Sequence, residues 1–408
     1  MLHSVKQVVL DTPPPSPQRI ITRTVWLLSL ISLFNDIASE MLVPVMPVFL
    51  RHIGFSVIFI GLLEGIAEAV AGLSKSYFGL QSDRLGKRLP FIQLGYAFSA
   101  ISKPLMALFT YPVWIFFVRT LDRLGKGIRT GARDALLSEE ATPQTKGRVF
   151  GFHRSMDTVG AVLGPSLALI YLYFHPHDYQ RLFLLTFIPG MLVIGTGFLV
   201  KEKRKLAVAD KKSGGLLSFL HYWKQSPAAY RKLLVGLLLF ALFNSADAFL
   251  LLKMKDSGMS DGAVIGLYIF YNLCFAVMAY PVGQVADQLG LKKIFLTGLL
   301  LFAAVYAGFA FNHNLIIYFV LFFLYGCYQA ATDGIAKAWI SNLVPREELA
   351  GAIGTYAGLQ SIAALFASLL CGVLWYGAGP VFTFCLTAAV ALISCYYLFR
   401  SVTETAAD

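Results

Sequence analysis

Apolar runs long enough to cross a bilayer follow one another along the chain, separated by short polar or turn-forming stretches. An α-helix needs about 20 mainly apolar residues to span the hydrocarbon core. The runs predict an all-α polytopic membrane protein with twelve transmembrane helices, at residues 22–50, 57–80, 90–110, 112–139, 147–174, 180–200, 232–254, 261–284, 293–312, 315–341, 349–375 and 379–400.

One polar stretch is longer than the others and divides the predicted helices into two sets of six. Residues 201–231 are basic near their start and aromatic from Phe219 to Trp223, where we expect a short interfacial helix. We therefore expect an N-terminal six-helix bundle at 22–200, a basic linker at 201–231 and a C-terminal six-helix bundle at 232–400. The tails would cover 1–21, which is proline-rich and expected to be disordered, and 401–408.

The two halves carry matching short motifs. Residues 79–88 read G-L-Q-S-D-R-L-G-K-R, and residues 283–293 read G-Q-V-A-D-Q-L-G-L-K-K, so both contain G-x-x-x-D-x-x-G. Leu-Phe-Asn at 33–35 recurs at 242–244, and Gly-Ile at 127–128 recurs at 334–335. The similar spacing of all three pairs predicts two pseudo-symmetric bundles, an arrangement that many transporters use.

The motif at 79–88 resembles the signature of the major facilitator superfamily, G-x-x-x-D-R-x-G-R/K-R/K, which joins helices 2 and 3. The first copy matches every fixed position, whereas the second has Gln288 in place of Arg and its lysines one position later. The resemblance implies a transporter whose two bundles rock about a central site. It also implies a cytoplasmic gate, for which the candidates are Gly79, Asp83, Arg84, Gly86, Lys87, Arg88, Asp134, Gly283, Asp287 and Gly290.

Within this gate, the resemblance places Asp83 near the start of helix 11, at residues 350–354. A helix start presents unpaired N–H groups and a partial positive charge, so it stabilises a carboxylate. We expect Lys87 and Arg88 to add ion pairs to Asp134. The alternative is that this basic loop only sets the orientation in the membrane.

Two further motifs resemble those of the same family. Arg123-x-x-Lys126-Gly127 is similar to its helix 4 motif R-x-x-Q-G, which implies a coupling or substrate role for Arg123. Gly160-x-x-x-Gly164-Pro165 resembles the helix 5 motif of its antiporters but lacks the closing pair of glycines. Small residues four positions apart also simply let helices pack closely.

Composition and charge agree with a membrane protein and predict its orientation. Hydrophobic residues make up 57% of the chain and charged residues 14%, and the net charge is +11. With the N-terminus inside, 21 basic residues lie in or beside the inner segments and 4 in the outer ones. The positive-inside rule therefore places both termini in the cytoplasm, in a multi-pass cytoplasmic (inner) membrane protein. The basic excess is explained without nucleic-acid binding.

Several predicted helices carry carboxylates, which are costly in hydrocarbon, at about 2.5–3.5 kcal/mol by insertion scales. Such groups are expected to face a water-filled cavity or an ionic partner. The candidates for proton coupling are Asp36, Glu40, Glu64, Glu68 and Asp157. The alternative for Glu64 or Glu68 is a static ion pair with Lys103 or Arg119.

The predicted helix at 112–139 carries a basic row, Arg119, Arg123, Lys126, Arg129 or Thr130, and Arg133, at helical spacing on one face. The alternative is that this helix ends near Arg123 and the later charges form a loop. The helix at 315–341 has a polar residue at every fourth position from Tyr325 to Ser341, although Asp333 and Lys337 could neutralise one another. The candidates for the substrate cavity are Asn35, Arg119, Arg123, Lys126, Arg154, Asn244, Asp247, Gln329, Asp333 and Lys337.

These features favour a monomeric secondary transporter that moves a small solute by alternating access with proton coupling. The basic row favours an organic anion. One alternative is proton-driven efflux of drugs or metal cations, and another is a transport-inactive sensor. The sequence contains no phosphate-binding loop and no H-E-x-x-H motif, and its five cysteines lie in apolar runs. We therefore expect no enzymatic activity, no cofactor, no metal site and no disulfide.

Overall fold

The structure is a computed structural model that describes residues 20–43, 45–46, 49–50, 53, 57–176, 178–202, 218–245, 247–259 and 261–402. The described part contains helices and no strand, as the apolar runs predict. Its helices are α1 (Arg23–Glu40), α3 (Val57–Leu85), α4 (Leu89–Leu105), α5 (Pro112–Glu139), α6 (Lys146–Phe174), α7 (Tyr179–Leu185), α8 (Phe187–Leu199), α9 (Ser218–Gln225), α10 (Ala228–Ala241), α11 (Ala248–Asp256), α12 (Asp261–Leu289), α13 (Leu291–Phe311), α14 (Leu315–Leu343), η1 (Arg346–Glu348) and α15 (Leu349–Ser401).

Each of the twelve predicted spans coincides, in the described residues, with a helix, part of one or a pair of helices. The span at 180–200 is divided at Thr186 into α7 and α8, and the span at 232–254 is divided at 242–247 into α10 and α11. The last two spans form α15, which bends at Gly379, where φ is 83°. The tails and most of the linker lie outside the described residues.

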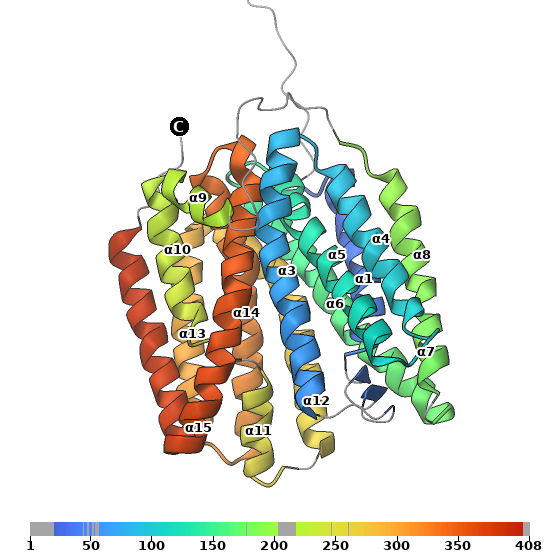
Figure 1. The fold of residues 1–408 in the computed structure, drawn as a ribbon. Coiled ribbons are helices and arrows are strands. Elements are labelled where there is room, and N and C mark those ends of the chain that lie inside the picture. Colours follow the sequence, from blue (N-terminus) through green and yellow to red (C-terminus); the bar gives the residue numbers. More distant parts are fainter. Residues whose placement is uncertain are drawn as a thin grey trace, which may run out of the picture.

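The helices run side by side in two groups (Figure 1). α1 and α3 to α8 form the N-terminal bundle, and α10 to α15 form the C-terminal bundle. One end of the molecule holds both signature loops, α9 and the end of α15, and we call it the loop face. The opposite end, which holds the connection between α11 and α12, is called the open face.

Two helix crossings make the most extensive contacts between the described parts of the bundles. α3 packs against α15, and α6 packs against α12. A Cβ atom built on Gly79 of α3 would overlap the Ala350 carbonyl of α15, and one on Gly283 of α12 would overlap the Gly147 carbonyl of α6. Glycine at both positions therefore lets the backbones approach closely.

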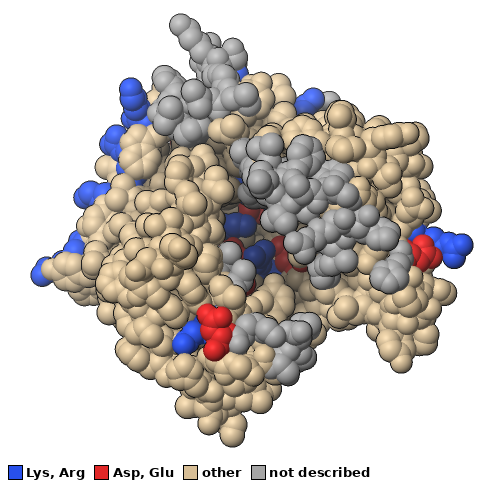
Figure 2. Space-filling model, turned by 60° about the horizontal axis from the view of Figure 1, so that its bottom comes forward, with Lys and Arg blue, Asp and Glu red and all other residues tan. Residues whose placement is uncertain are grey.

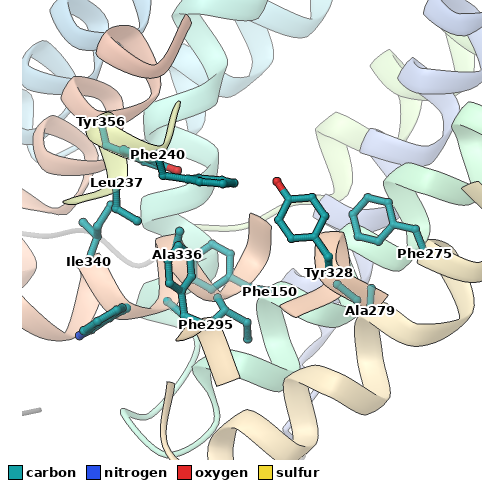
Figure 3. Packing of buried hydrophobic residues seen from close by; sticks show 14 of the residues in the cluster. Phe150, Leu237, Phe240, Phe275, Ala279, Phe295, Tyr328, Ala336, Ile340 and Tyr356 are labelled. Carbon is teal, nitrogen blue, oxygen red and sulfur yellow. The ribbon is translucent and has the colours of Figure 1, made fainter. Parts of the chain in front are cut away.

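Apolar side chains from both bundles also meet near the loop face (Figure 3). Phe150 of α6 is buried in the same cluster as Phe295 of α13 and Ala336 and Ile340 of α14. Gly334 of α14 lies directly against the Phe150 backbone and side chain. This contact helps to hold the two bundles together in the half of the molecule that ends in the loop face, which we call the loop half.

Helix α9 falls where the aromatic patch of the linker predicts a helix. Its Tyr222 is buried, packs edge-on against Tyr230 with ring centroids 5.7 Å apart, and hydrogen bonds Glu348 at 3.4 Å. α9 therefore covers the start of α15 on the loop face.

Candidate functional site

A cavity of about 510 Å³ lies between the two bundles and is lined by residues of both. Figure 2 turns the open face toward the viewer and shows a hollow in which basic and acidic side chains are visible. We call it the central cavity. Its lining includes the candidate residues Asn35, Asp36, Glu40, Arg123, Lys126, Arg154, Asp157, Asn244, Asp247, Gln329, Asp333 and Lys337.

Helix α5 supplies the basic wall of this cavity. The helix continues unbroken to Glu139, so the alternative in which it ends near Arg123 is wrong. Arg123, Lys126, Arg129 and Arg133 line the cavity, whereas Arg119 does not. The Arg129 guanidinium stacks 4.5 Å from the Tyr96 ring centroid and donates to Ser99 Oγ at 2.8 Å, which fixes its position.

Asp122, which the sequence analysis did not select, lies at the centre of the α5 charges. Its carboxylate is 3.2 Å from Lys103 Nζ, 3.7 Å from Arg119 Nη1 and 4.0 Å from Arg123 Nε. Lys103 and Arg119 thus have an ionic partner in Asp122. The side chains of Glu64 and Glu68, their expected alternative partners, lie outside the described residues.

The candidate proton carriers differ in their surroundings. Asp36 and Glu40 of α1 are half-buried, line the cavity one turn apart, and form no ion pair with the described residues. Asp36 Oδ1 accepts a hydrogen bond from Asn35 Nδ2 at 3.0 Å. Asp157 of α6 is instead held by Arg154 Nη1 at 3.1 Å and lies 3.8 Å from His153 Nε2.

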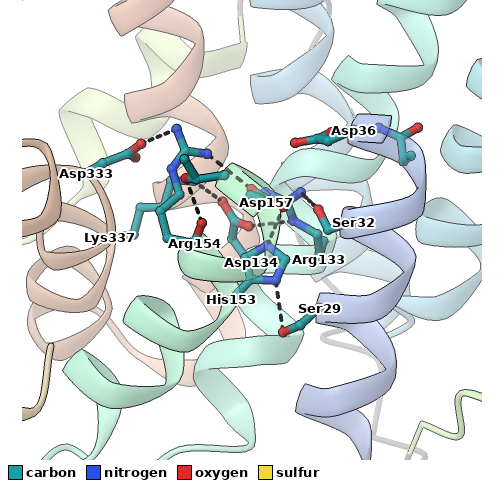
Figure 4. A network of polar contacts seen from close by, with 12 residues as sticks. Ser29, Ser32, Asp36, Arg133, Asp134, His153, Arg154, Asp157, Asp333 and Lys337 are labelled. Atoms are coloured by element: carbon teal, nitrogen blue, oxygen red, sulfur yellow. Dashed lines mark hydrogen bonds and ion pairs between the residues drawn. The ribbon is translucent and has the colours of Figure 1, made fainter. Parts of the chain in front are cut away.

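Two ion pairs cross from one bundle to the other at the cavity floor (Figure 4). Arg154 of α6 pairs with Asp333 of α14, and Lys337 of α14 lies 2.9 Å from Asp134 Oδ2 of α5. Asp134 is fully buried and is also paired with Arg133 at 2.9 Å. The suggestion that Asp333 and Lys337 neutralise one another is therefore wrong, because each pairs with the N-terminal bundle.

The C-terminal wall combines polar and aromatic groups. Asn244 and Asp247 lie in the break between α10 and α11, where Asn244 Nδ2 donates to Tyr328 Oη at 3.1 Å and Tyr325 Oη donates to Asp247 Oδ1 at 2.7 Å. Tyr268, Tyr271 and Tyr328 also line the cavity. The sequence analysis missed these tyrosines, although the pairs at 268 and 271 and at 325 and 328 recur at helical spacing.

The first signature loop holds the start of α15. Asp83 accepts hydrogen bonds from the N–H groups of Ala350 at 3.2 Å and Gly351 at 2.5 Å, and it pairs with Arg88 at 2.5 Å. Arg88 also pairs with Glu139 at 3.2 Å. The expected pairs to Asp134 are not formed. Asp134 lies deeper, against Lys337, whereas Lys87 is exposed on the loop face and Arg84 forms no ion pair with the described residues.

The second signature loop holds the start of α6 in the same way. Asp287 accepts from the N–H groups of Gly147 at 2.7 Å and Arg148 at 3.0 Å, and from Arg148 Nε at 2.9 Å. We call this contact and that of Asp83 the two latches. Each joins one bundle to a helix start of the other.

In each signature loop, the last glycine of the G-x-x-x-D-x-x-G motif has a positive φ. φ is 59° at Gly86 and 101° at Gly290, and a side chain at either position would be strained. The motif thus contains two kinds of glycine. The first permits a close helix crossing, and the last permits the turn.

The comparisons with known proteins agree with this architecture. The sequence model of the Major Facilitator Superfamily matches residues 28–271 and 233–408. An uncharacterized MFS-type transporter of Methanocaldococcus jannaschii is 31% identical over 382 residues, covering 92% of this chain and 94% of its own. Solved structures of the human organic anion transporter MFSD10 and the E. coli fucose:proton symporter superpose with TM-scores of 0.79 and 0.75, at 16% and 14% identity. The MFSD10 superposition covers 92% of this chain and 99% of the MFSD10 chain, and the symporter superposition covers 94% of this chain and 100% of the symporter chain.

These matches run along nearly the full length of the chain, and they confirm the family to which the signature loop points. The protein is a polytopic membrane protein with two helical bundles, a charged cavity between them and a pair of latches at one end. This architecture carries a solute and does not catalyse a reaction. The chain belongs to the major facilitator superfamily of membrane transporters.

Proposed function

We propose that the protein moves a small organic anion across the cytoplasmic membrane by alternating access, coupled to protons. The loop face is cytoplasmic in this proposal, because the basic residues between helices concentrate there. Both latches are formed and the central cavity is hollowed toward the open face. The described conformation then corresponds to an outward-facing state.

The observation that carries the anion proposal is the basic wall of α5. The carboxylate of Asp122 faces Lys103, Arg119 and Arg123, so several cations gather on this wall. Arg123 and Lys126 are half-buried and line the cavity, so a bound solute can reach them. Charge-assisted hydrogen bonds from Arg and Lys to a carboxylate or phosphate ester are among the strong polar contacts in proteins.

Proton coupling is supported by Asp36 and Glu40, with Asp36 as the leading candidate. A carboxylate that faces the cavity and is not held by a cation can bind a proton on one side of the membrane and release it on the other. Asp157 is held by Arg154, so a proton competes there with an existing ion pair. The structure does not describe the side chains of Glu64 and Glu68.

A second candidate function is export of an organic cation. The C-terminal wall supports it, because Asp247 lies among cavity-lining tyrosines and aromatic faces attract cations. In this alternative, the carboxylates of α1 carry protons in exchange for the cation.

The test is uptake of radiolabelled carboxylates, phosphate esters and quaternary amines into proteoliposomes under an imposed pH gradient. We expect accumulation of anions, and about a tenfold or greater loss of apparent affinity in Arg123→Gln, because a hydrogen bond to a charged group contributes ~1.5–3 kcal/mol. Arg181→Gln, which removes an exposed cation paired with Asp178, is the matched control. Transport of amines alone favours the second function, and binding without uptake or exchange favours a sensor.

A further inference from the structure

A second, smaller cavity lies on the loop face, where the two latched helix starts come together. Its volume is about 230 Å³, and it is lined by the end of α5, the start of α6, the end of α14 and the segment that leads into α15. The lining residues are Ser138, Ala141, Pro143, Lys146, Ser341, Asn342, Val344, Pro345, Arg346 and Leu349. It is separate from the central cavity, with which it shares no lining residue.

The charged side chains that line this loop-face cavity are basic, and its polar groups also include the buried Asn342 Oδ1, which has no hydrogen-bond partner. Ser138 is 2% exposed, and its Oγ has no hydrogen-bond partner. Lys146 is buried, and its Nζ donates one hydrogen bond, to the Ser341 carbonyl at 2.6 Å. Arg346 is exposed at the rim. No Asp or Glu of the described residues lines the cavity, and Glu139, near Ser138 in the chain, is paired with Arg88.

We propose that the loop-face cavity binds a small anion through a phosphate or carboxylate group. An ammonium group has three donors and Lys146 uses one of them on Ser341, so two can reach an anion. The bound anion accepts a hydrogen bond from the Ser138 hydroxyl, which otherwise has no hydrogen-bond partner. The Arg346 side chain adds a second positive charge at the rim. The Arg346 backbone carbonyl still accepts a hydrogen bond from Arg88.

Because the site is built from both bundles, its occupancy depends on the conformation. Ser138 and Lys146 belong to the N-terminal bundle, whereas Ser341 and Arg346 belong to the C-terminal bundle. The site is complete only when the loop face is closed, and a ligand that binds one state better shifts the population toward that state. The anion therefore acts as a regulator that favours the loop-closed conformation, independently of which solute the central cavity carries.

Inorganic phosphate and citrate are the soluble probes for this site. The purified full-length protein in phosphatidylcholine nanodiscs is heated at constant ionic strength while each probe is titrated, and the apparent Kd is taken from the rise in Tm. We expect saturable stabilisation of the wild type and at least tenfold weaker binding in Arg346→Gln and in Ser138→Ala. Lys293→Gln, which removes an exposed cation elsewhere on the loop face, should bind like the wild type.

Nanodiscs with phosphatidylglycerol and no added probe identify a lipid headgroup as the source of the phosphate. Stabilisation in these nanodiscs that is lost in Arg346→Gln supports the site with a lipid ligand. Equal stabilisation of all variants means that the probe binds in the central cavity or as an adventitious ion only, and it overturns the proposal. The proposal is also overturned if neither probe nor the anionic lipid stabilises the wild type.

Discussion

Carboxylates in the central cavity and beneath it have different partners. Asp122 and Asp134 each contact two or more cations, and these ion pairs are part of the contacts between packed helices. Asp36 and Glu40 contact no cation among the described residues. A proton can therefore come and go at Asp36 without breaking an ion pair, whereas loss of charge at Asp122 or Asp134 removes an ionic partner from the buried Lys103 or Arg133.

At this scale we predict that Asp36→Asn abolishes accumulation of substrate driven by a pH gradient but leaves exchange of substrate between the two sides intact. The amide retains a hydrogen bond to Asn35, so the melting temperature should change little. Asp122→Asn is the contrasting variant, and we expect it to lose about 3 kcal/mol of stability because buried cations lose their partner. Proton-driven accumulation by Asp36→Asn would exclude Asp36 as the coupling group.

At the scale of elements, the two glycine crossings control how closely the bundles approach. α3 meets α15 at Gly79 and Ala350, and α6 meets α12 at Gly147 and Gly283. These pairs are related by the internal repeat, so the same packing is used twice. The contacts exist only when the loop face is closed, because each pair joins two different bundles.

We predict that Gly79→Ala destabilises the closed loop face without unfolding either bundle. Its Cβ would overlap the Ala350 carbonyl, and overpacking costs typically 1–3 kcal/mol. A tenfold population change corresponds to about 1.4 kcal/mol. Labelling of a cysteine introduced at Ser341, in a background without native cysteines, should therefore rise by about tenfold.

Gly195→Ala is the matched control, because a Cβ at Gly195 in α8 meets no atom within 4 Å. Replacing a helical glycine by alanine there should raise stability by up to about 1 kcal/mol and leave the labelling unchanged. Equal labelling of the Gly79→Ala and Gly195→Ala proteins would show that the crossing does not limit opening.

At the scale of the whole molecule, the described contacts that hold the bundles together concentrate in the loop half. Asp83 and Asp287 hold helix starts of the opposite bundle, and the pairs of Asp333 and Lys337 lie between these latches and the cavity. The two latches are related by the repeat, and each combines a carboxylate with backbone N–H groups. Opening toward the loop face requires both to break.

We predict that Asp83→Asn and Asp287→Asn each shift the population toward the loop-open state by about tenfold or more, because each removes hydrogen bonds to a charged group worth ~1.5–3 kcal/mol. The free-energy changes should add in the double variant, since the latches share no residue. Distances between spin labels on the loop ends of α3 and α15 would report the populations.

Orientation in the membrane should stay the same in these variants, because the basic residues are retained. Unchanged distance distributions, together with normal transport in the double variant, would rule out the latches and leave the basic loop with a role in topology alone.

The sequence by itself determined the helix count, the two-fold repeat and the family, because hydrophobic length, helical spacing and a contiguous motif are local properties. It also placed most of the candidate residues on the cavity, since charged groups inside an apolar bundle must face water or a partner. Only the tertiary structure decided the partners. Arg88 pairs with Glu139 rather than Asp134, and Asp333 pairs with Arg154 rather than Lys337. The contact of Asp83 with Gly351 agrees with the expectation drawn from the family resemblance, which spacing along the chain alone does not give. The physical reason is that an ion pair depends on how helices pack and turn in three dimensions, and no spacing within one helix encodes that geometry.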